Sequence, residues 1–153
     1  MLGNLLYTVH VLGAVLWVGG MAFALLALRP ALAALEPPQR LLLHEGALKR
    51  FFLIVWHAMP ALLLTGWALL FFWYGGFRGA GWHIHLMHGT GLAMAAVFLA
   101  LFLGPWRAFR AARASGDTAG AAANADRVRR LVTINFALGL LTVAVAAWGR
   151  FGG

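Results

Sequence analysis

Four long apolar stretches constrain the fold of this chain more than any other feature. They cover about residues 5–28, 51–74, 82–104 and 131–151. A stretch of about 20 apolar residues is long enough to cross the hydrocarbon core of a bilayer as a helix. Charged residues make up only 10% of the chain, whereas soluble domains carry about 25%. The sequence therefore predicts an all-α integral membrane protein with one domain, residues 1–153.

The connections between the stretches predict how the helices are arranged. Short connections favour an up-down-up-down four-helix bundle. The first helix should end at Arg29-Pro30 and the third at Pro105, because proline cannot continue a regular helix, and residues 106–130 should form a loop. We find no convincing internal repeat in the sequence.

The basic residues predict the orientation. Arg78 and Arg150 lie at one side of the predicted bundle, and the other ten lie in the first and third connections. These ten are Arg29, Arg40, Lys49, Arg50, Arg107, Arg110, Arg113, Arg127, Arg129 and Arg130. Positively charged connections stay in the cytoplasm, so we expect both termini outside. Because topology accounts for the net charge of +8, nucleic acid is not an expected partner.

The residue types present exclude several kinds of chemistry. The chain has no cysteine, which rules out disulfides, iron–sulfur clusters, thiolate copper sites and covalent c-type haem. All four acidic residues fall in the predicted cytoplasmic connections. A proton pump built on buried carboxylates is therefore not expected.

The stretch GWHIHLMHG places four metal-binding side chains at the outer end of the third helix. They are His83, His85, Met87 and His88. Imidazole binds copper and haem iron, and thioether binds Cu(I). The alternative is a belt of interfacial side chains, a role that suits Trp82. Four such ligand types within six positions favour a metal or haem site.

A second candidate site lies on the first helix. His10, Gly13, Trp17 and Gly20 follow at i, i+3, i+7 and i+10, which places them on one helical face. Glycines beside a flat aromatic wall would accept a porphyrin, and small residues would equally let two helices pack closely. His10 has a predicted depth similar to that of His85 and His88. Two imidazoles from facing helices hold a b-type haem.

Other residues are weaker candidates. His57 precedes Pro60 by three residues and would either bind metal or satisfy the carbonyl of Trp56 that proline leaves free. Arg78 and Arg150 would pair with haem propionates or extend to the interface. Met21, Met59 and Met94 could supply soft ligands deeper in the bundle, and Asn135 would hold helices together.

Several segments resemble the copper-resistance protein D (CopD) family, in particular its small stand-alone members. They are His10 with Trp17-Val18-Gly19-Gly20, Leu28-Arg29-Pro30, Glu36-Pro37-Pro38-Gln39-Arg40, the run from Gly81 to Met87, and Arg129 to Asn135. The resemblance implies movement of copper across the inner membrane of Gram-negative bacteria, and His83 and His85 match the outward motif. The opening helix is also similar to HemJ-type protoporphyrinogen oxidases, which are associated with haem b, and this implies that His10 is a ligand.

Together these features predict a small inner-membrane protein with periplasmic termini. The leading hypothesis is a bis-histidine haem b protein, with His10 and either His85 or His88 as ligands, that transfers electrons to or from a quinone or a periplasmic partner. The alternatives are copper transport through His83, His85, Met87 and His88, a protoporphyrinogen-oxidase-like enzyme, and a purely structural bundle. The lipid bilayer is an expected partner, and a homodimer is compatible with the sequence.

Overall fold

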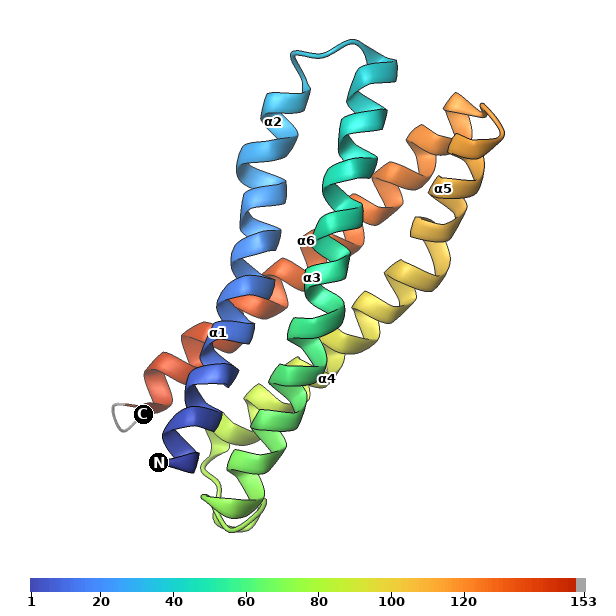
Figure 1. Cartoon of the computed structure of the whole chain (residues 1–153). Coiled ribbons are helices and arrows are strands. Elements are labelled where there is room, and N and C mark those ends of the chain that lie inside the picture. The colour runs from blue at the N-terminus through green and yellow to red at the C-terminus, as the bar shows by residue number, and fades with distance from the viewer. Residues whose placement is uncertain (151–153) are drawn as a thin grey trace.

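The computed structural model describes residues 1–150, and within them every regular element is a helix (Figure 1). The first half contains α1 (Leu2–Phe23), the π-helix η1 (Ala24–Leu28), α2 (Arg29–Leu32) and α3 (Pro37–Phe72). The second half contains α4 (Trp82–Leu101), the π-helix η2 (Phe102–Trp106), α5 (Arg107–Ala114) and α6 (Thr118–Arg150).

These elements form four continuous helical rods, each long and apolar enough to cross a membrane. The rods are Leu2–Leu32, Pro37–Phe72, Trp82–Ala114 and Thr118–Arg150. The predicted all-α membrane fold with four helices is confirmed. The 36 residues of α3 extend about 54 Å at 1.5 Å per residue, whereas the hydrocarbon core is about 30 Å thick. The helices therefore continue well beyond the apolar spans, because polar residues also hold helical structure outside the membrane.

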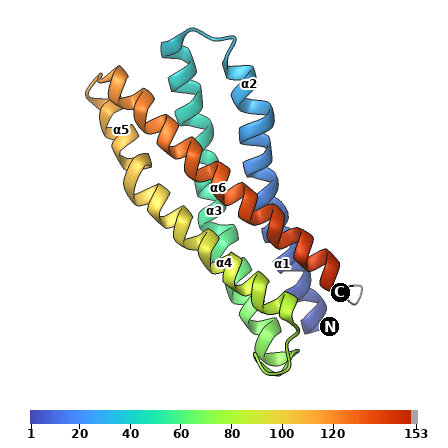
Figure 2. The ribbon, with the colours of Figure 1, turned by 180° about the vertical axis from the view of Figure 1, so that it is seen from behind.

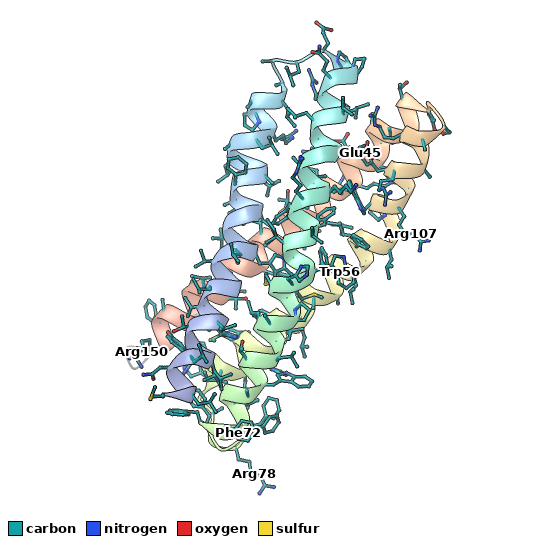
Figure 3. The ribbon with its side chains drawn as sticks, viewed as in Figure 1. Glu45, Trp56, Phe72, Arg78, Arg107 and Arg150 are labelled. Carbon is teal, nitrogen blue, oxygen red and sulfur yellow. The ribbon has the colours of Figure 1, made fainter. Side chains whose placement is uncertain are left out.

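The start of α1, the end of α6 and the 73–81 connection lie at one end of the bundle, and the 33–36 and 115–117 turns lie at the other (Figures 1 and 2). Arg78 and Arg150 lie at the end with the termini (Figure 3). All ten other basic residues lie on the rods, in the halves nearer the 33–36 or the 115–117 turn. That the termini face the periplasm remains a prediction from this distribution of charge.

The helices continue through two prolines that were expected to end them. Pro30 follows η1 by two residues, and Pro105 lies inside η2. Proline lacks an N–H group, and its ring collides with the carbonyl four residues earlier in a regular α-helix. The wider turn of a π-helix removes that conflict locally. The expected loop over residues 106–130 is likewise helical, apart from the turn at 115–117.

The two halves repeat the same order of elements. In each half, an α-helix, a five-residue π-helix, a short α-helix, a tight turn and a long α-helix follow one another. We call residues 2–72 the first hairpin and residues 82–150 the second hairpin. Helices pack extensively within each hairpin, and α1 against α6 and α3 against α4 join the two. The sequence hides this repeat, because lipid-facing positions accept any apolar side chain.

Aromatic side chains in the interior hold the hairpins together. Phe52 of α3 meets Trp106 of η2 edge-to-face, with ring centroids 5.0 Å apart. Trp17 of α1 meets Phe98 of α4 in the same manner, at 6.3 Å. Edge-to-face pairs stabilise by about 0.5–1.5 kcal/mol beyond the burial of their area. Nearer the turns, Arg113 of α5 also donates to Glu45 of α3 at 3.2 Å.

Glycines set the distance between α1 and α3. A Cβ atom added at Gly13 would lie 3.3 Å from the carbonyl oxygen of Ala58, and one added at Gly20 would collide with the ring of Phe51. Both glycines therefore serve close helix packing, which is the second of the two roles predicted for them.

Substitution at Gly13 should separate α1 from α3. We expect Gly13→Leu to destabilise the protein by about 1–3 kcal/mol, the usual range for overpacking. The thermal unfolding midpoint of the detergent-solubilised protein measures this change. Gly19→Leu is the matched control, because no neighbouring atom lies within 4 Å of its added Cβ. Equal midpoints for the two variants would contradict the packing role.

Candidate functional site

His10 is oriented by the helix that faces it. Its Nδ1 lies 2.9 Å from the carbonyl oxygen of Leu62 and 3.2 Å from the hydroxyl of Thr65. Because a carbonyl oxygen only accepts, Nδ1–H donates to Leu62 and Nε2 keeps its lone pair. Thr65 is itself held by a hydrogen bond to the carbonyl of Ala61. A ligating histidine is normally fixed in this way through its other nitrogen, so His10 is suited to bind a metal ion through Nε2.

The outer histidines point in different directions. The ring of His85 stacks on that of Phe77, with ring centroids 5.7 Å apart. The ring of His88 meets Phe77 edge-on, with centroids 5.2 Å apart, and its centroid lies 6.0 Å from that of Trp67. His83 instead packs against Gly149 of α6. The Nδ1 atom of His83 is buried and has no hydrogen-bond partner.

The GWHIHLMHG stretch therefore presents two pairs of ligands. His85 and His88 are three residues apart and share Phe77 as a neighbour. Met87 follows His83 by four residues and so lies on the His83 face of α4. Across residues 1–150, no three His, Asp or Glu side chains gather closely enough to hold a metal ion. The predicted ligands are present at one end of the bundle, and they do not converge on a single point.

The predicted haem pocket is filled by protein. The α1 face that would receive a porphyrin packs on α3 through Gly13 and Gly20, and Trp17 is 1% exposed against Phe98. The hydrogen-bond partners of His10 belong to α3, not to the helix that carries His85 and His88. The residues present do not fit a haem in this arrangement, and haem binding stays a prediction from the sequence.

His57 lies on the outside of the bundle. Its side chain is exposed, and its Nδ1 donates to the carbonyl of Leu53 at 2.8 Å rather than to that of Trp56. It lines an open, almost entirely apolar groove of about 510 Å³ between α1 and α3. In a membrane this groove faces lipid. His57 thus lies on the outer surface, whereas the methionines that were predicted to act with it as metal ligands are buried.

The three methionines predicted to lie deeper in the bundle are all in its core. Met21, Met59 and Met94 are 1%, 6% and 4% exposed, and they come from α1, α3 and α4. Sequence reasoning missed two polar residues near Met94, namely Thr90 and Thr142, whose hydroxyl oxygens are 2.7 Å apart. The signal that could have revealed them is a threonine in the middle of an apolar span.

The two outward arginines lie at the same end of the molecule as the GWHIHLMHG stretch. Arg78 extends away from the bundle from the 73–81 connection, and Arg150 ends α6 (Figure 3). Both side chains are exposed. Their pairing with haem propionates therefore remains a prediction from the sequence.

Comparison with known proteins adds a family. The family model described as copper resistance protein D matches residues 45–149, which is more than two thirds of the chain and includes GWHIHLMHG. No curated protein and no solved structure matches the chain. The matched region begins inside α3 and ends at residue 149 of α6. It covers the outer histidines, the buried Met94 and Thr90, and the half-buried Thr142. The chain belongs to the copper resistance protein D family.

Proposed function

We propose that this protein carries copper ions across the membrane, with the outer histidines and Met87 as the capture site. The observation that carries the proposal is the family match over residues 45–149, because the matched region contains every residue of GWHIHLMHG. Copper is the cargo, and the protein provides a path for it across the bilayer.

The chemistry of the outer end suits capture and release. Imidazole and thioether bind copper ions, and thioether favours Cu(I). His85 and His88 form one pair of ligands beside Phe77, and His83 and Met87 form the other. Two small ligand sets that do not converge would hold a copper ion loosely, and a transporter requires binding that is weak enough for the cargo to leave.

His10 would receive the ion from the outer pairs. It lies inside the first span, about six residues outside the centre of residues 5–28, which is about 9 Å along the helix. Its Nδ1 is engaged by Leu62 and Thr65, so its Nε2 is the nitrogen available for a metal ion. The imidazole then binds without first losing a proton.

Removing the outer ligands should stop copper uptake. We expect the combined variant His83→Ala, His85→Ala, His88→Ala to lower copper accumulation in expressing cells by more than about tenfold, since even losing an outer-shell partner lowers metal affinity about 10–100-fold. Cellular copper measured by mass spectrometry reports the change. His57→Gln is the control, because His57 lies in the lipid-facing groove and should leave accumulation unchanged.

Two results would contradict the copper proposal. The first is unchanged copper accumulation when the wild-type protein is expressed or deleted. The second is a purified protein with one haem per chain, seen as a Soret band that sharpens on reduction, together with no copper binding. The second result would favour the haem prediction made from the sequence.

The orientation of His10 gives a separate test. His10→Gln keeps a side-chain donor for the carbonyl of Leu62 and removes the imidazole Nε2, so uptake should fall as far as in His10→Ala. Thr65→Val removes only the hydroxyl that contacts Nδ1, and we expect a loss of about tenfold. Uptake assays on equal amounts of membrane protein compare the three variants. Full activity in His10→Gln would exclude His10 as a ligand.

A further inference from the structure

Two polar residues and a glycine lie on the face of α6 that packs against α4 and also reaches α1. Asn135, Gly139 and Thr142 follow at i, i+4 and i+7 and share one face of α6. A Cβ atom added at Gly139 would lie 2.9 Å from Val18 of α1 and 3.2 Å from the terminal methyl of Met94 of α4. This face of α6 therefore contacts the first hairpin and α4 at once.

A hydrogen-bonded pair of threonines joins α6 to α4 at this level. The hydroxyl oxygens of Thr142 and Thr90 are 2.7 Å apart, and the Thr142 hydroxyl also lies 4.0 Å from the sulfur of Met94. Each threonine hydroxyl in addition reaches a carbonyl of its own helix, that of Leu138 or Leu86. The thioether of Met94 thus has a polar neighbour, Thr142, within a largely apolar core.

Asn135 has a feature that helix packing does not explain. Its side chain is 2% exposed, and its carbonyl oxygen Oδ1 is buried without a hydrogen-bond partner. Buried polar groups are almost always paired, and leaving one unpaired destabilises a protein. An asparagine that only held two helices together would use this oxygen as an acceptor. The oxygen of Asn135 therefore leaves one acceptor free for a ligand at this face of α6.

We propose that Met94 and the Thr90–Thr142 pair form a transient site for Cu(I) in the middle of the membrane, on the α4–α6 face of the second hairpin. Asn135, about 10 Å from Thr142 along α6, would supply the next oxygen ligand on the same path. The inference rests on the proposed copper transport and places its path along the α4–α6 face. Met94 is one residue from the centre of residues 82–104, so the site lies close to the midplane. Transporters built from repeated units bind their cargo at this depth.

The ligand chemistry fits a passing monovalent ion. The Met94 sulfur is a soft ligand that selects Cu(I), and the oxygens of Thr90 and Thr142 replace part of its hydration shell. The oxygen of Asn135 does so further along α6. None of these four groups carries a charge, and no acidic residue lies in the apolar spans. Neutral ligands bind a cation without trapping it, as conduction requires.

Variants at Met94 test this site against a matched control. Met94→Leu removes the sulfur at nearly constant volume, and Met59→Leu makes the same change at a core methionine on α3 that is also buried, at 6% exposure. We expect Met94→Leu to lower cellular copper uptake at least tenfold and Met59→Leu to leave it near the wild-type value. X-ray absorption spectra can be recorded for Cu(I) bound to purified protein that also carries Met87→Leu. In that background, adding Met94→Leu should remove the sulfur neighbour of the copper ion, and adding Met59→Leu should not.

Asn135 provides an independent measurement. Asn135→Leu should lower uptake to a similar extent, while the thermal unfolding midpoint stays the same or rises, because the variant removes an unpaired buried oxygen. A midpoint that falls by several degrees would mean that Asn135 is a packing residue.

The failure of this site can be distinguished from the failure of copper transport. If the wild-type protein neither takes up nor binds copper, the proposed function is wrong. If the wild-type protein transports copper and Met94→Leu transports equally well, or if Met59→Leu is as impaired as Met94→Leu, copper crosses by another route and the inferred site is overturned.

Discussion

The absence of water in the hydrocarbon core governs this structure. A backbone N–H or carbonyl has no solvent partner there, so the chain must be helical wherever it crosses. Side-chain polar groups obey the same rule: the imidazole of His10 donates to Leu62, and Thr90 meets Thr142. The buried carbonyl oxygen of Asn135 is an exception, and it lies on the α6 face that touches both hairpins.

The repeated hairpin explains how a short chain builds an interior with more than one kind of surface. Within each hairpin, close packing through small residues and threonines brings the helices together, as Gly13 does for α1 and α3. Between the hairpins, aromatic edge contacts such as that of Trp17 with Phe98 fill the space. The contacts of Met94, Thr90 and Thr142 lie between α4 and α6 of the second hairpin, and the first hairpin carries the oriented His10. The proposed copper path would run from the GWHIHLMHG stretch toward the α4–α6 face of the second hairpin.

Several local features could not be predicted, each for a physical reason. Proline was expected to end the first and third helices. A π-helical turn beside Pro30 and another around Pro105 instead let each helix continue although proline has no N–H group to donate. The spacing of His10, Gly13 and Gly20 was compatible with a porphyrin or with a neighbouring helix, because both require a flat face with little side-chain volume. Helical periodicity shows which residues share a face and does not show what covers that face.

The sequence by itself determined the membrane class, the number of helices and the end of the bundle at which the histidines lie. Those properties depend on apolar length and on the position of charge, which are read along a single segment. Only the tertiary structure decided which residues meet. It separated His83 from His85 and His88, turned His57 outward, and brought Met94 next to Thr142. These outcomes depend on the rotation and register of each helix against its neighbours, which arise from packing across residues distant in the chain.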